Sequence, residues 1–171
     1  MLNAIERVCL VLRGFVSAIV VVLFVIMLTA VLAQVAGRYF FNFAIAQAAE
    51  IATFSQIWLV LLGAGVALAR GQHVAIDVLP SQLPLPLARL ALIAIAAVSA
   101  AFLAVLAYGA LPLIKLGQFQ TSPALQMPMK YMYACLPVGA GYMVLELVLS
   151  VVQRWHDPFP LPSVETEEEA I

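Results

Sequence analysis

The residues of this sequence that could take part in chemistry are few, and two of them are acids inside long apolar stretches. Glu50 and Glu146 are each surrounded by aliphatic and small residues, where a charged side chain costs at least ~2.5–3.5 kcal/mol on membrane-insertion scales. Such acids serve either ion or proton coupling or the pairing of helices and subunits. We interpret both as structural, because coupled transport sites usually contain broken helices and repeated segments, and the sequence shows no internal repeat.

Arginines offer partners to both acids. Arg38 ends the first apolar stretch and Glu50 enters the second after a short turn, so we expect a salt bridge between them at a shared depth. Glu146 lies about two helical turns from the end of the last stretch. Its candidate partners are a proton or one of three arginines near that end, Arg13, Arg70 and Arg89.

Ligands for a metal or a haem are scarce. His73 and Asp77 are four residues apart, but a lone pair of this kind is a weak metal signal, and we interpret it as a surface or subunit contact. Haem between helices needs histidines inside the spans, whereas the second histidine, His156, lies in the C-terminal tail. Cys9 and Cys135 are expected near opposite membrane faces, beyond the ~7 Å reach of a disulfide. We therefore predict no catalytic residue, cofactor or metal.

The composition indicates which elements must position these residues. Of 171 residues, 65% are hydrophobic and 10% are charged, whereas soluble domains are about half apolar and about a quarter charged. Crossing a bilayer takes about 20 helical residues, and four stretches are long enough: 14–37, 43–69, 90–114 and 131–152. Helices are expected because lipid offers no partner for the backbone of an open strand. The sequence predicts an all-α, integral membrane four-helix bundle in a single domain, 1–155.

The first stretch could be a span or a signal peptide. Its apolar length exceeds the roughly 7–15 residues of a signal core, so we expect it to be retained. Residues 1–13 before it are amphipathic, and they form either a short interfacial helix or an extension of the first span.

Positive charge predicts the orientation. Basic residues favour the cytoplasmic side, and placing both termini there puts five arginines inside against three basic residues outside. The inside set is Arg7, Arg13, Arg70, Arg89 and Arg154, and the outside set is Arg38, Lys115 and Lys130. The net charge of −1 gives no sign of a nucleic-acid partner.

The segments between and after the spans have distinct characters. The cytoplasmic loop that contains residues 70–80 mixes apolar and polar residues, so we expect it to lie along the membrane surface. The tail, 156–171, is rich in proline and then glutamate, which is typical of a disordered segment. Small residues recur at four-residue spacing and favour close helix packing, within the chain or with a partner: Gly63 with Ala67, and Ala96 with Ala100 and Ala104.

Several stretches, taken in order, carry a family resemblance. They are 34–42 at the end of the first span, Glu50 with 57–59 and 62–64 in the second, 70–77 in the loop, and 121–125, Pro128 and 133–139 around the last span. Together they resemble the small membrane subunits of TRAP (tripartite ATP-independent periplasmic) transporters, the DctQ-like subunits. That family often has paired acids at the start of the second span, whereas here Ala49 precedes Glu50.

The resemblance implies a role in the bacterial inner membrane. Such transporters combine a periplasmic solute-binding protein, a small subunit and a large transport subunit, and they import organic acids with an ion gradient. The small subunit would be a scaffold that supports the large subunit and helps the binding protein to dock. Membrane lipid is the other expected partner. The structural or partner-interface candidates in the sequence are Arg38, Tyr39, Asn42, Glu50, Arg70, His73, Asp77 and Glu146.

Two other functions stay open at this point. Four-helix chains also anchor respiratory redox enzymes, where haem usually sits between histidines of two helices. A small exporter that works as an oligomer of this chain is the second alternative.

Overall fold

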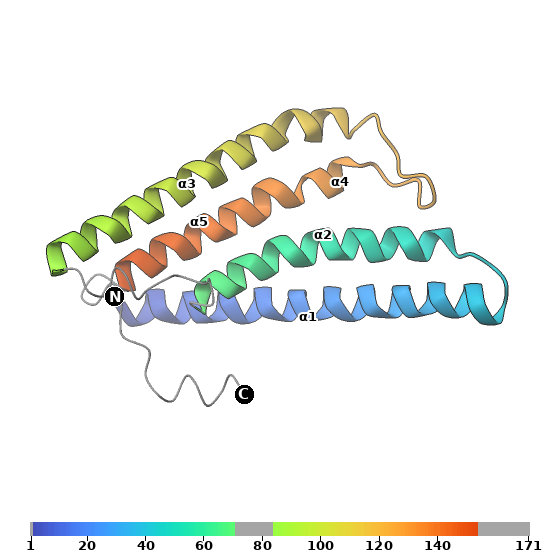
Figure 1. The fold of residues 1–171 in the computed structure, drawn as a ribbon, viewed down its shortest axis with the longest axis horizontal. Coiled ribbons are helices and arrows are strands. Elements are labelled where there is room, and N and C mark those ends of the chain that lie inside the picture. The colour runs from blue at the N-terminus through green and yellow to red at the C-terminus, as the bar shows by residue number, and fades with distance from the viewer. Residues whose placement is uncertain (1, 71–83, 154–171) are drawn as a thin grey trace.

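The computed structural model describes residues 2–70 and 84–153, and long helices make up most of this length (Figure 1). The helices are α1 (Leu2–Phe40), α2 (Ala46–Ala69), α3 (Leu85–Leu116), α4 (Lys130–Tyr133) and α5 (Cys135–Gln153). Four of the apolar segments are long enough to cross a membrane, with α4 and α5 together forming the last. The prediction of an all-α protein with four membrane-length helices is confirmed.

The helix ends follow from local sequence. Pro137 has no backbone N–H to donate to the carbonyl of Tyr133, and the last span is divided into α4 and α5 there. The second span begins at Ala46, three residues later than the predicted Phe43. A separate N-terminal helix is not confirmed, because α1 runs without a break from Leu2 to Phe40. The predicted interfacial loop and acidic tail lie outside the described residues.

The four long helices lie in a row. In the described part of the chain, α1 packs on α2, α2 on α5, and α5 on α3, while the backbone of α1 contacts that of neither α3 nor α5. Figure 1 shows this order, with α1 and α3 at the two edges. Burial agrees with this order. In each central span 22% of the most apolar 18-residue stretch is buried, against 11% in the edge spans α1 and α3. The row therefore leaves large surfaces of every helix open to lipid or to a partner.

The central seam of the row joins α2 to α5 through glycines. A Cβ on Gly139 would lie 2.8 Å from the Cβ of Leu61, and a Cβ on Gly65 would collide with the ring of Tyr142. Small residues allow helix backbones to approach this closely. The two central helices therefore pack closely at these glycines.

The small residues predicted to favour close helix packing differ in their surroundings. Gly63 faces α1, since a Cβ there would lie 3.9 Å from Val20. Ala104 is exposed on α3, so it takes little part in packing within the described row.

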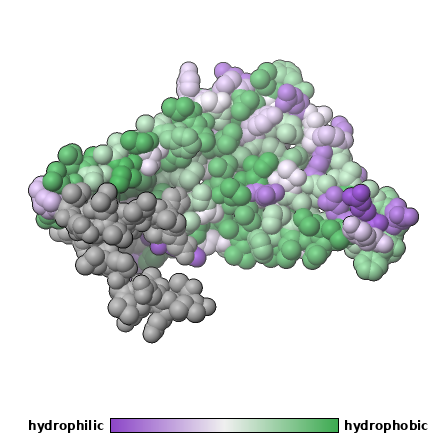
Figure 2. All heavy atoms as spheres, viewed as in Figure 1, coloured by the Kyte–Doolittle hydropathy of each residue, from purple (hydrophilic) through white to green (hydrophobic). Residues whose placement is uncertain are grey.

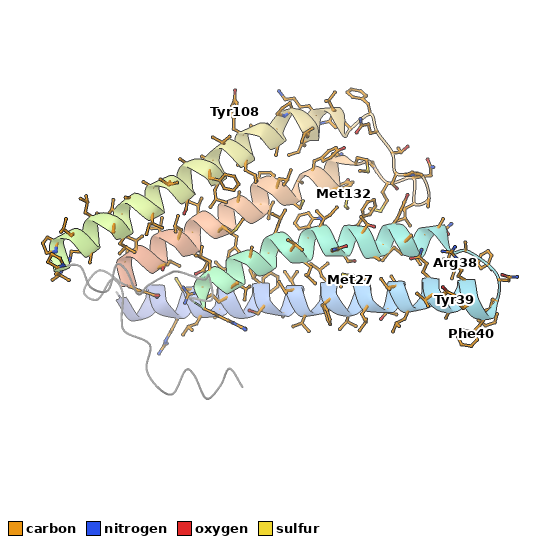
Figure 3. All side chains as sticks on the ribbon, viewed as in Figure 1. Met27, Arg38, Tyr39, Phe40, Tyr108 and Met132 are labelled. Carbon is orange, nitrogen blue, oxygen red and sulfur yellow. The ribbon has the colours of Figure 1, made fainter. Side chains whose placement is uncertain are left out.

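The surface has the character of a membrane protein. Large hydrophobic side chains are exposed along both edge helices, and Tyr108 projects from α3 into the surroundings (Figure 3). Figure 2 shows hydrophobic residues along the length of the row and hydrophilic residues gathered toward the end where α1 turns into α2. This distribution matches an apolar membrane interior next to a polar end.

Candidate functional site

The acid near the end of α5 is bound by an arginine of α1. Arg13 donates from Nη2 to Oε2 of Glu146 at 2.7 Å, and from Nε to Oε2 and Oε1 at 3.0 and 3.2 Å. The Glu146 side chain is 0% exposed and that of Arg13 is 24% exposed. Among the three candidate arginines, Arg13 is therefore the partner that the structure gives to Glu146.

This ion pair joins two helices whose backbones are not in contact. Because α1 and α5 are not in backbone contact, the long side chain of Arg13 bridges them past the end of α2. Tyr142 lies one turn before Glu146 on the same face of α5. Its ring fits against α2 because residue 65 is glycine. The pair acts as a brace between an edge helix and a central helix.

The acid near the start of α2 is bound by backbone groups of the outer loop. The N–H groups of Ala124 and Leu125 donate to the two carboxylate oxygens of Glu50 at 2.7 and 2.8 Å. The prediction of a salt bridge between Arg38 and Glu50 is wrong. Among the described residues, the ion pair that forms is Arg13–Glu146. Arg38 is exposed at the end of α1 (Figure 3), whereas the loop tip brings two donors directly to Glu50.

The outer loop, residues 117–129, is held in a defined hairpin by its own backbone. The N–H of Met129 donates to the carbonyl of Gln120, and the N–H of Ser122 donates to that of Met127, both at 2.9 Å. The Ser122 hydroxyl accepts from the Met127 N–H at 3.3 Å, and Ser122 is 1% exposed. At the base a Cβ on Gly117 would lie 2.6 Å from the Lys130 nitrogen, so only glycine fits there.

The turn between α1 and α2 explains Asn42. Its φ is 52°, a left-handed conformation that asparagine tolerates better than most residues. The N–H groups of Phe41 and Phe43 both donate to the carbonyl of Gly37, which closes the end of the helix. Asn42 therefore shapes the turn. Tyr39, also predicted as an interface candidate, is strongly exposed beside it.

The comparisons with known proteins decide the family. The sequence matches the family described as "Tripartite ATP-independent periplasmic transporters, DctQ component" over residues 27–157. The chain belongs to the DctQ family. It is therefore a small subunit of a TRAP transporter and a multi-pass protein of the inner membrane, and its family is a transporter component rather than an enzyme family. The resemblance seen in the sequence is confirmed.

A curated relative agrees with this assignment. The chain is 33% identical over 101 residues to the isethionate TRAP transporter permease protein DctMQ of Oleidesulfovibrio alaskensis. The match covers 58% of this chain and 16% of the relative. This DctQ chain thus corresponds to a small part of a much longer permease.

One groove on the row of this DctQ subunit is apolar. It has a volume of about 530 Å³ and lies between α2 and α3, with α5 as its floor. Ser99 is the polar residue of a lining that is otherwise aliphatic and aromatic. Such a lining suits lipid tails or apolar side chains better than a hydrated anion.

Of the remaining predicted residues, the structure describes Arg70, which bonds to neither acid. Arg70 ends α2 and is exposed, and His73 and Asp77 lie outside the described residues. Within the described ranges no three His, Cys, Asp or Glu side chains gather as a metal site. Sequence reasoning missed Ala124 and Leu125, whose side chains carry no polar group. The one available signal was the turn-forming Thr-Ser-Pro sequence that precedes them.

Proposed function

We propose that this DctQ subunit is a stationary scaffold in an importer of small organic anions driven by an ion gradient. In this role it supports a large transport subunit and helps a periplasmic solute-binding protein to dock. The observation that carries the proposal is the single row of four spans, with long faces uncovered along every helix. A row of this kind supplies contact surface to a partner.

The state of the two membrane acids supports a structural role. A coupling acid must exchange its ion or proton during transport, but both oxygens of Glu146 are bound by Arg13. Both oxygens of Glu50 are bound by the outer loop. In this arrangement each acid joins two parts of the subunit.

The proposed substrate class comes from the family and the relative. The relative is named for isethionate, a small organic sulfonate, and TRAP transporters as a class import organic acids. We assign this transporter to small carboxylates or sulfonates, with selection by the binding protein and the large subunit.

The proposed orientation places both termini in the cytoplasm. The distribution of arginines supports it, and the Arg13–Glu146 pair keeps the start of α1 and the end of α5 at the same end of the row. The loop 117–129 then faces the periplasm. An impermeant thiol reagent applied to intact cells should label a cysteine placed at Thr121 and leave a cysteine placed in the tail unlabelled.

Reconstitution tests the transport role. Liposomes that contain this chain alone should show no saturable uptake of an organic acid. Liposomes with the chain, the large subunit and the binding protein should show uptake that collapses when the ion gradient is removed. Saturable, gradient-driven uptake by the lone chain would overturn the scaffold role.

A further inference from the structure

We propose that Glu50 is a positioning residue that holds the outer loop in the shape to which the periplasmic solute-binding protein docks. This inference rests on the proposed function. It assigns the docking surface to residues 117–129 and assigns the control of that surface to an acid on α2.

The loop is fixed at two places by different kinds of bond. Its base is closed by the Lys130 N–H, which donates to the carbonyl of Gly117 at 3.0 Å. Its tip is tied to α2 by the two hydrogen bonds from Ala124 and Leu125 to Glu50. Bonds to a charged acceptor are stronger than neutral ones. The tip therefore takes its position from α2, although the loop itself connects α3 to α4.

The exposed side of the loop has the composition of a protein contact. Phe119 is 89% exposed and Met127 is 41% exposed, and between them lie exposed polar residues, Gln120, Thr121 and Gln126. Aromatic residues and methionine are enriched in protein interfaces, whose cores contain few charges. No residue from 117 to 129 is charged, so this surface matches that pattern.

Charges around the loop indicate what the partner presents. Arg38, Lys115 and Lys130 flank it, and the acid at this end of α2, Glu50, is bound to the backbone. A partner with a neutral centre and an acidic rim complements this surface. Because the loop lies at a polar end of the row, that partner is a soluble protein rather than a membrane helix.

The test uses the complete complex of this chain with its large subunit in lipid nanodiscs. Glu50→Gln keeps the shape of the side chain but removes the charge, and Glu50→Ala removes both acceptors. Gln47→Ala is the matched control, since Gln47 is exposed one turn earlier on α2. Three quantities are measured: the amount of large subunit that co-purifies, hydrogen exchange at Ala124 and Leu125, and the affinity for the solute-binding protein.

The proposal predicts a specific pattern. Both Glu50 variants should keep the large subunit, speed exchange at the loop tip, and weaken docking, by about tenfold for Glu50→Gln and more for Glu50→Ala. Gln47→Ala should match the unaltered complex in all three measurements. Unchanged exchange at the tip, or faster exchange with unchanged docking, would overturn the positioning role of Glu50.

Two further results keep the inference testable. If the Glu50 variants fail to assemble, Phe119→Ser and Thr121→Ala change exposed side chains only; weakened docking supports the loop as the contact, and unchanged docking of both overturns it. A failure of the unaltered complex to bind the solute-binding protein would overturn the docking role itself. Exchange at Ala124 and Leu125 would still report on the bond to Glu50.

Discussion

The two membrane acids of this subunit lie at opposite ends of the helix row and are bound by different kinds of group. Glu146 is fully buried and meets a side-chain cation, so it joins two helices, α1 and α5. Glu50 meets backbone N–H groups, so it joins a helix to a loop. The difference separates a brace that maintains the fold from a bond that controls the shape of a surface. Changes at the two ends should therefore have different consequences.

The largest effect is expected at the buried pair. Arg13→Ala leaves the Glu146 carboxylate buried without a partner, and breaking a buried ion pair in this way costs about 3–5 kcal/mol. We expect a strong loss of folded protein and a lower unfolding temperature in detergent, measured by thermal unfolding of the purified chain.

A double variant serves as the control for that loss. Replacing both partners with apolar residues of similar length, Arg13→Met with Glu146→Met, removes the two charges together and is often close to neutral. Its stability should exceed that of Arg13→Ala. If the double variant lost as much stability as the two single variants together, the ion pair would not be the brace described above.

A smaller effect is expected at the glycine seam between α2 and α5. Gly139→Ala places a Cβ 2.8 Å from the Cβ of Leu61, and overpacking of this kind costs about 1–3 kcal/mol. Gly141 is the matched control on the same helix, because a Cβ there would meet nothing within 4 Å. Thermal unfolding should place Gly139→Ala clearly below Gly141→Ala, and equal values would contradict the close approach.

The comparison of the two acids also shows what the sequence could predict. Four spans followed from apolar length, since a bilayer requires about 20 helical residues. Arg13 was among the candidate partners of Glu146 because arginine and glutamate are recognisable side chains. Glu50 was paired wrongly because its true partners are backbone N–H groups, which every residue except proline carries.

The arrangement of the helices was beyond the sequence for a related reason. Each span is apolar on all of its faces, so the sequence pattern does not indicate which face packs on a neighbouring helix. The order α1, α2, α5, α3 depends on where glycines such as Gly65 and Gly139 let backbones meet. Similar small residues elsewhere, such as Ala104, face outward.

The smallest effect is expected at Arg38, and it separates the outer end from the inner end most sharply. Arg38 is exposed and the carboxylate of Glu50 is bound by Ala124 and Leu125, so Arg38→Ala should change stability by no more than about 0.5 kcal/mol. The stability change of the double variant, Arg38→Ala with Glu50→Ala, should equal the sum of the changes in the single variants. Stability changes at sites without a shared partner are additive. A coupling between Arg38 and Glu50 as large as that between Arg13 and Glu146 would show that an ion pair forms at both ends. The distinction between a brace and a loop-holding acid would then be lost.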